Sequence, residues 1–254
     1  MRLSNRIAIV IGAGQSPGEG IGNGRTTALR FTQEGAKVFA VDCNLASAEE
    51  TAAMARKGGT GECVAFQADV TKEQTLKAAF TAARERWGRI DILHYNVGVS
   101  ISGGDAPLLE ITEDAFDLIA RVNLRGAIMA CKQVLPIMRE QRSGVILTIS
   151  SLAAWEQYPY VAYKATKAGL IAFTQQVAIQ NAEYGIRANV ILPGLMDTPM
   201  AVDTRVRVSG NTRAEVSAAR NAKVPLRHRM GTAWDVANAA ATLFGVRYLW
   251  PSRP

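Results

Sequence analysis

The chain of 254 residues has little of what a metal centre or a histidine-based hydrolytic triad needs. It holds two histidines, His94 and His228, and three cysteines that lie far apart, Cys43, Cys63 and Cys131. Their spacing matches no set of metal ligands, so we expect no metal site. So few scattered cysteines favour a reducing, cytoplasmic location. No apolar run approaches the about 18 residues of a membrane-spanning helix, so we expect no membrane partner.

The positive charge is unevenly distributed. The net charge is +7, and from residue 203 to the end nine basic residues face only three acidic ones. Such a segment could meet nucleic acid or an anionic substrate. Its arginines are scattered, however, without interleaved aromatic residues or a helix-turn-helix pattern. We therefore expect no nucleic-acid partner and interpret the segment as a solvated face or as a subunit contact in a homo-oligomer.

A buried strand followed by a glycine-rich turn opens the chain. The run from Arg6 to Gly12 is apolar, and six glycines follow between positions 12 and 24, before a helical pattern from Arg25 to Glu34. Glycines let a pyrophosphate approach the backbone, and a helix N-terminus offers free N–H groups. Glycine alone could equally indicate a flexible loop, so the turn needs a second signal.

The second signal is Asp42, which ends the next strand, Lys37 to Val41. A carboxylate at this position accepts hydrogen bonds from the adenosine ribose hydroxyls and repels a 2′-phosphate. An isolated aspartate at a strand end could simply be solvated. After this turn and this strand, it favours NAD over NADP as the cofactor.

Strands and helices then alternate to the end of the chain. We predict strands at 63–67, 91–95, 145–149 and 186–192, and helices at 47–57, 72–87, 114–138 (with a break near 123), 162–183 and 233–244, with Thr71 capping the helix that ends at Trp87. This order indicates an α/β fold, a single doubly wound parallel sheet with helices on both faces. Without repeats or linkers, residues 1–254 form one predicted domain, whose ligand binds at the carboxyl ends of the strands.

A proton-transfer site is predicted around Tyr163 and Lys167. The two residues are four apart at the start of a helical pattern, so they share a helix face. A nearby ammonium would favour the phenolate and lower a pKa that is normally about 10, making Tyr163 a general acid/base. Ser150 and Ser151 follow the strand that ends at Ile149, and their hydroxyls could hold a substrate oxygen. Adjacent strand residues face opposite ways, so only one serine, preferably Ser151, is expected to take part.

Together these motifs resemble the short-chain dehydrogenase/reductase family over nearly the whole chain, to about residue 245. The matching segments are the glycine turn, Ala68-Asp69-Val70, Tyr95-Asn96-Val97-Gly98, Val122-Asn123-Leu124, Ile149-Ser150-Ser151, Tyr163-x-x-x-Lys167, and Pro193-Gly194 with Thr198. The resemblance implies a Rossmann fold and four catalytic residues: Asn123, Ser151, Tyr163 and Lys167. It also implies that the lysine binds the nicotinamide ribose and that the asparagine orders a water molecule in a proton relay.

The resemblance also implies a set of cofactor contacts. Phosphate would lie against Gly12, Gly14, Gly22 and Gly24, and adenine against Asp69 and Val70. The cofactor cleft would be lined by Asn96, Gly98, Tyr163 and Lys167, and the nicotinamide amide would be held by Pro193, Gly194, Met196 and Thr198.

Two departures from the family pattern change the expectations. The glycine turn is longer than the common form by the segment from Gln15 to Ile21, which leaves its phosphate contacts open. The C-terminal segment from Gly245 to Pro254 does not resemble the usual last strand, although Val246 to Trp250 could add a short edge strand. Because that strand commonly supports subunit packing, the resemblance leaves a dimer or a tetramer open.

The predicted function is an NAD-dependent oxidoreductase that interconverts a secondary alcohol and a ketone. The alternative is a non-enzymatic protein that senses NAD or binds a partner on the same fold. Residues 195–225 are expected to form a substrate lid. Aromatic residues and methionines near the site favour an apolar, medium-sized alcohol, or else they pack the lid or a subunit contact. Arg205 and Arg207 could bind an acidic substrate, but we interpret them as surface charge.

Overall fold

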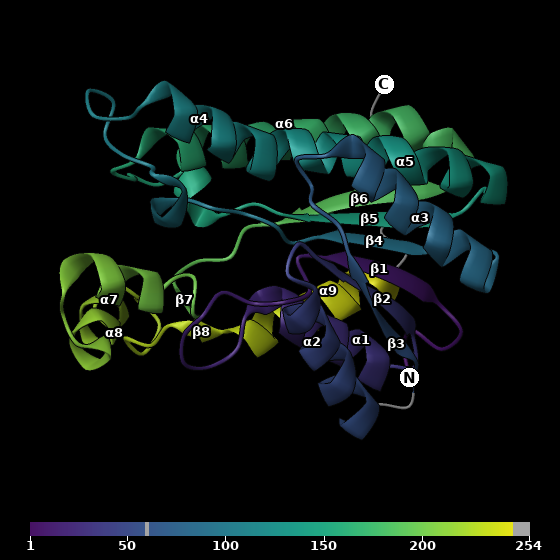
Figure 1. Ribbon diagram of the computed structural model, residues 1–254, viewed down its shortest axis with the longest axis horizontal. Helices are drawn as coiled ribbons and strands as arrows, with labels where there is room; N and C mark the ends of the chain where they lie inside the picture. Colours follow the sequence, from purple (N-terminus) through teal and green to yellow (C-terminus); the bar gives the residue numbers. More distant parts are fainter. Residues whose placement is uncertain (59–60, 246–254) are drawn as a thin grey trace.

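Six parallel strands form the central sheet of the computed structural model, which describes residues 1–58 and 61–245 (Figure 1). The strands are β1 (Ile7–Ile11), β2 (Lys37–Asp42), β3 (Cys63–Gln67), β4 (Ile92–Tyr95), β5 (Gly144–Ile149) and β6 (Ile186–Ile191). Their order is β3-β2-β1-β4-β5-β6, so the winding direction reverses between β1 and β4. The doubly wound sheet is confirmed, and the reversal creates a crevice for a ligand at the carboxyl ends of these strands.

Helices cover both faces of the sheet because its central strands are apolar on both faces. Along β1, Ile9 and Ile11 pack into one hydrophobic cluster, whereas Ala8 and Val10 pack into another on the opposite face. On the first face lie α3 (Glu73–Trp87), α5 (Gly126–Gln141) and α6 (Val161–Asn181), and on the second lie α1 (Asn23–Gln33), α2 (Leu45–Gly58) and α9 (Ala233–Gly245) (Figure 1).

The helix predicted with a break is confirmed. Helix α4 (Glu113–Ala120) continues through a π-helical turn, η2 (Arg121–Arg125), directly into α5. A π-helical turn inserts a residue into the helix and frequently marks a functional site. Asn123 lies in the middle of this turn.

The predicted cap of α3 is wrong. The residue before the helix is Lys72, and its side chain makes no capping hydrogen bond. Thr71 instead donates its hydroxyl to Asp69 Oδ1 at 2.7 Å. The helix begins at Glu73, one residue later than predicted, so Thr71 is not the residue that flanks it, and its hydroxyl binds the carboxylate two residues earlier in the loop.

A small unit of helices that the sequence did not predict lies beyond the carboxyl end of the sheet, at the left in Figure 1. It consists of β7 (Met196–Asp197), α7 (Asp203–Ser209), α8 (Arg213–Asn221) and β8 (Gly231–Thr232), and β7 pairs with β8. Val202, Val216 and Met230 form its own hydrophobic cluster. The described residues also include three short 3₁₀ turns: η1 (Ile101–Gly103), η3 (Leu152–Ala154) and η4 (Ala182–Tyr184).

The C-terminal edge strand suggested for Val246 to Trp250 lies outside the described residues. In the part of the chain that is described, no helix combines the length and the apolar character needed to span a bilayer.

Close packing at Gly126 gives a stability prediction. A Cβ atom at this position would lie 2.3 Å from the hydroxyl oxygen of Tyr95 and 3.0 Å from Val70 Cβ. The Tyr95 hydroxyl is buried and donates to the Val122 carbonyl at 2.6 Å, so it has no room to move. We expect Gly126→Ala to lower the free energy of unfolding by about 1–3 kcal/mol, as overpacking does, when measured by urea denaturation.

Gly58→Ala is the matched control, because no described heavy atom lies within 4 Å of a Cβ built at Gly58 in the last turn of α2. This variant should match or slightly exceed the wild-type stability. Equal stability of the Gly126→Ala protein would contradict the packing described here.

Candidate active site

Helix α6 brings Tyr163 and Lys167 together at the carboxyl end of β5. The Lys167 Nζ lies 5.6 Å from the centroid of the Tyr163 ring, as expected for residues four apart on one helix. Ser151 lies two residues beyond the end of β5 and faces the same place. The structure thus brings together three of the four predicted catalytic residues.

The Lys167 ammonium is buried among backbone carbonyls. Its Nζ donates to the Ile149 carbonyl at 2.7 Å and to the Val97 carbonyl at 3.4 Å, at the ends of β5 and β4. A Cβ at Gly98 would lie 3.0 Å from this nitrogen, so the cofactor-lining glycine leaves room for the lysine. Burial lowers the pKa of Lys167 to about 7. The charge of this side chain therefore changes near neutral pH.

The predicted direction of the Tyr163 pKa is wrong. Burial raises the pKa of this phenol to about 12, although a hydrogen bond with Ser151 and the charge of Arg205 both act to lower it. Two physical facts explain the difference. The phenolate loses hydration at this site. The charged form of Lys167 is also disfavoured by burial, and its Nζ points to backbone carbonyls.

The two serines have different surroundings. Ser150 is buried and donates to the Lys167 carbonyl at 2.7 Å, so it joins β5 to the backbone of α6. Ser151 interacts with the Tyr163 phenol, and its Oγ accepts from the Ala153 N–H at 3.2 Å. The geometry therefore directs Ser151, rather than Ser150, to the phenol.

A residue that sequence reasoning missed, Asp105, holds the first turn of α6. Its carboxylate accepts from the backbone N–H groups of Ala162 and Tyr163, both at 3.0 Å, and from the Ser100 hydroxyl at 3.0 Å. A carboxylate is favourable at a helix N-terminus, and this one orients the turn that carries Tyr163. It stands 57 residues before Ala162, whose N–H it accepts from, so no local motif could reveal it.

Tyr158 is a second residue beside Tyr163 that sequence reasoning did not assign to the site. Its ring centroid lies 5.6 Å from that of Tyr163, and its hydroxyl lies 3.1 Å from Ser100 Oγ. Tyr158 and Ser100 thus place a pair of hydrogen-bonded hydroxyl groups near the Tyr163 ring.

Asn123 is fully buried in the π-helical turn. Its amide oxygen accepts from the Val99 N–H at 2.8 Å, and its amide nitrogen donates to the Val99 carbonyl at 2.9 Å and to Thr166 at 3.1 Å. These bonds fix the loop after β4 against α6. Asn123 thus lies in the same region as Lys167 without bonding to it.

The glycine turn packs too closely for any other residue at Gly24. A Cβ there would lie 1.8 Å from the Gly12 carbonyl oxygen. Gly12 itself has a φ of +82° and contacts Val97, and its carbonyl accepts from the Asn96 amide at 3.3 Å. These contacts bring the N-terminus of α1 against the ends of β1 and β4, which is the arrangement that a pyrophosphate requires.

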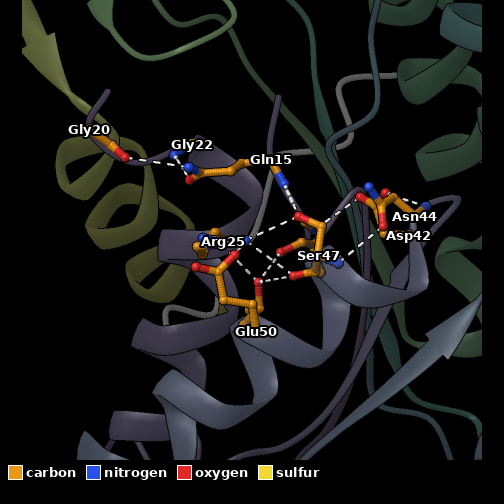
Figure 2. Close-up of polar contacts among 11 residues, drawn as sticks. Gln15, Gly20, Gly22, Arg25, Asp42, Asn44, Ser47 and Glu50 are labelled. Carbon is orange, nitrogen blue, oxygen red and sulfur yellow. Dashed lines mark hydrogen bonds and ion pairs between the residues drawn. The ribbon is translucent and has the colours of Figure 1, made fainter. Parts of the chain in front are cut away.

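Asp42 faces this turn from the end of β2. One carboxylate oxygen accepts from the Gly14 N–H at 2.9 Å and the other from the Asn44 N–H at 3.0 Å (Figure 2). A Cβ at Gly14 would lie within 2.9 Å of this carboxylate. The acid is thus held beside the turn, where a ribose would lie.

The side chain of Gln15 forms hydrogen bonds across the inserted part of the turn. The Gln15 amide oxygen accepts from the Gly22 N–H at 3.1 Å, and the Gln15 amide nitrogen lies 3.4 Å from the Gly20 carbonyl (Figure 2). Gln15 thus takes up the Gly22 N–H, from which a phosphate oxygen could otherwise accept a hydrogen bond. A phosphate at Gly22 would have to displace Gln15.

Buried Arg25, also missed from the sequence, joins the turn to α2. Its guanidinium bonds to Ser47, Thr51 and, at 2.6 Å, to Glu50 (Figure 2). Ser47 in turn accepts from the Gln15 N–H at 3.0 Å. The glycine turn is therefore held against α2 by a hydrogen-bond network that includes the Arg25–Glu50 ion pair.

The other predicted cofactor residues surround the same crevice. Asp69 accepts from Thr71 in the loop after β3, and the Val70 side chain packs into the core against Gly126. On the far side, the Pro193 carbonyl accepts from the Leu152 N–H at 3.0 Å, and Gly194 follows it. Met196 is buried in β7, and Thr198 Oγ1 accepts from the Ala201 N–H at 3.3 Å.

His94 is a packing residue. It is fully buried in β4, its ring centroid lies 5.9 Å from that of Phe31, and burial lowers its pKa to about 3. Across residues 1–58 and 61–245, no three His, Cys, Asp or Glu side chains are grouped as metal ligands.

Comparison with known proteins decides the family. A family profile described as enoyl-(acyl carrier protein) reductase matches residues 17–247. A solved structure of a short-chain dehydrogenase/reductase from Burkholderia xenovorans superimposes with a TM-score of 0.88 and 37% identity, over 95% of this chain and 90% of that chain. The chain belongs to the short-chain dehydrogenase/reductase family.

Curated relatives of this short-chain dehydrogenase/reductase are oxidoreductases. The chain is 35% identical to 2-(R)-hydroxypropyl-CoM dehydrogenase of Xanthobacter autotrophicus over 95% of this chain and 92% of that protein. It is 33% identical to levodione reductase of Leifsonia aquatica over 95% of this chain and 88% of that protein. A crystal structure of levodione reductase superimposes with a TM-score of 0.88, at 31% identity and over 95% of this chain and 91% of that chain.

The protein is accordingly an oxidoreductase that acts on CH–OH groups, and its family uses a nicotinamide cofactor, NAD or NADP. The described residues fit such a group. A side chain at Gly24 would strike the Gly12 carbonyl within the glycine turn, and the lack of a side chain at Gly98 leaves space beside Lys167.

Burial of Lys167 gives a pH-dependent stability. Its pKa is about 7 in the folded protein and 10.5 in the reference state, so the unfolded chain binds more protons between these values. Wild-type stability should then rise with pH in this window, by up to about 1.4 kcal/mol per pH unit from this one group. Lys167→Met removes the group, so its stability relative to wild type should be greatest near pH 7 and should fall towards pH 9.

Urea unfolding at pH 7, 8 and 9 measures this difference. Lys223→Met, which removes an exposed lysine, is the control for net charge. Parallel pH profiles for wild type and Lys167→Met would show that Lys167 titrates alike in the folded and unfolded chains.

Proposed function

We propose that this protein is an NAD-dependent oxidoreductase that interconverts a secondary alcohol and a ketone, with Tyr163 as the general acid/base. One observation carries the proposal: Ser151, Tyr163 and Lys167 meet at the carboxyl end of β5, beside Gly98 and the glycine turn. The relatives are dehydrogenases and reductases, which supports the same reaction class.

The proposed proton transfer follows from the pKa values. With a pKa of about 12, Tyr163 is protonated at neutral pH and is ready to donate. A nicotinamide held beside Gly98 and Lys167 would supply the hydride to the carbonyl carbon when a ketone is reduced. Tyr163 gives its proton to the carbonyl oxygen, which becomes the hydroxyl, and Ser151 holds that oxygen. In the direction of alcohol oxidation it is the tyrosinate, stabilised by Lys167, that takes the hydroxyl proton.

Lys167 is proposed to act on the tyrosine and on the cofactor. Its nitrogen lies 5.6 Å from the phenol ring, close enough for a protonated ammonium to stabilise a tyrosinate when it forms. We also propose that it binds the nicotinamide ribose, in exchange for its longer contact with Val97. Asn123 fixes the loop beside it and is proposed as the fourth residue of the proton relay.

The region 195–225 is proposed as a lid on the substrate. It contains α7 and α8, has its own small hydrophobic cluster, and packs on η1 beside Ser100. Residues 1–254 are proposed to form one domain. A protein that only sensed NAD would not require Ser151 to interact with Tyr163, so the alternative is less favoured.

Tyr163→Phe tests the catalytic role. The change removes only the hydroxyl, so we expect kcat for secondary alcohols and ketones to fall at least about a hundredfold, the usual contribution of a positioned acid/base. Fluorescence titration should give a Kd for NADH within about threefold of wild type. Turnover that survives this change would refute the assignment.

Asp42→Asn tests the cofactor preference. Asparagine keeps an oxygen that can accept from Gly14 or Asn44 but removes the negative charge that would repel a 2′-phosphate. In fluorescence titrations we expect wild type to prefer NADH over NADPH, and the variant to lose about 1–2 kcal/mol of this preference, roughly five- to thirtyfold in the Kd ratio. Wild-type preference for NADPH would overturn the assignment of NAD.

A further inference from the structure

Two arginines in the 195–225 region lack the acidic partner that their neighbour has. Arg213 is paired with Asp197 at 2.6 Å, Asp203 at 3.4 Å and Glu19 at 3.7 Å. Arg213 thus supplies one positive charge to a group of three carboxylates. Within residues 1–58 and 61–245, neither Arg205 nor Arg220 has a carboxylate oxygen within 4.0 Å.

Both side chains are held in place by neutral groups. Arg205 donates to the Ala201 carbonyl at 2.6 Å, one turn earlier in the chain. Arg220 lies with one nitrogen 3.4 Å from the Met196 carbonyl and another 3.3 Å from Met230 Sδ. Met196 lies at the start of the proposed lid and Met230 lies just after its end. Each guanidinium is therefore held in a fixed position by a neutral group.

Arg205 lies near the phenol of Tyr163, and the two arginines lie near each other and near Tyr158. The positive charge of Arg205 acts on both Tyr163 and Tyr158, and it also opposes the charge of Arg220. Burial, followed by this repulsion from Arg205, lowers the pKa of Arg220 to about 10, although Asp197 and Tyr158 act in the opposite direction. Two like charges that are close together, half-buried and unpaired are unfavourable until an anion lies between them.

We propose that Arg205 and Arg220 form an anion site, and that the substrate is a secondary alcohol or ketone carrying a carboxylate or a similar anionic group. This inference rests on the proposed function, because the anion site is placed relative to Tyr163. The reacting oxygen lies at Ser151 and Tyr163, and the anionic end of the same molecule lies at the two guanidiniums. The interpretation of Arg205 as surface charge is thereby replaced, whereas Arg207 donates to the Pro17 carbonyl at 3.1 Å and is not part of the site.

The test uses matched pairs of ketones that differ in charge but not in size. Acetoacetate is paired with pentane-2,4-dione, and 4-oxopentanoate with hexane-2,5-dione. With NADH and wild-type protein, we expect kcat/KM for at least one oxo acid to exceed that of its neutral partner by about tenfold or more, the effect of a charge-assisted contact.

Single variants locate the contact. Arg205→Met and Arg220→Met should each lower kcat/KM for the oxo acid about tenfold, while the neutral diketone changes less than about threefold. Arg205→Lys and Arg220→Lys keep the charge and should lose less than the methionine variants. Lys223→Met removes an exposed positive charge after α8 and should leave the preference for the acid unchanged. Circular dichroism and urea unfolding check that each variant is folded.

Binding of an unreactive acid separates failure of this inference from failure of the proposed function. Calorimetric titration of the NADH complex with pentanoate should show binding that Arg205→Met and Arg220→Met weaken, whether or not any ketone is reduced. Tyr163-dependent turnover without preference for the acids, and without pentanoate binding, would refute the anion site and leave the oxidoreductase function standing. A Kd for NADH that rises in the arginine variants would overturn the inference by assigning the two charges to the cofactor phosphates.

Discussion

The position of one buried ammonium determines much of the site. Lys167 Nζ bonds to the carbonyls of Ile149 and Val97, and so connects α6 to the ends of the two strands that flank the crevice. The carbonyl of Lys167 accepts from Ser150, which fixes the same helix to β5 a second time. Gly98 has to be small because the ammonium lies where its side chain would be. Helix, strands and cofactor crevice are thus aligned by one side chain.

The strands could be predicted from the sequence because their signal is local. Parallel strands covered on both faces are short apolar runs, and each strand here ends at, or is followed within two residues by, a polar residue, glycine or proline. Strands β4, β5 and β6 end at Tyr95, Ile149 and Ile191, each within one residue of the predicted end. The Tyr163–Lys167 pair could be predicted for the same reason, since helical spacing alone places both residues on one face.

What could not be predicted depends on contacts between distant residues. Asp105 caps α6 from across a long loop, and Arg25 lies beneath the glycine turn only because α2 supplies Ser47 and Glu50. The direction of the Tyr163 pKa depends on burial, which the spacing of two residues does not reveal. The helices α7 and α8 are short and are stabilised by a cluster assembled from several segments, so their local patterns are weak.

The lengthened glycine turn reaches the segment 195–225, the proposed lid. The Pro17 carbonyl accepts from Arg207, the Glu19 N–H donates to Asp203 at 3.3 Å, and a Cβ at Gly18 would strike the Asp203 side chain. A shorter turn would leave Asp203 and Arg207 without these partners. The two segments are therefore mechanically coupled, because a displacement of Asp203 or Arg207 either breaks these contacts or carries the turn with it.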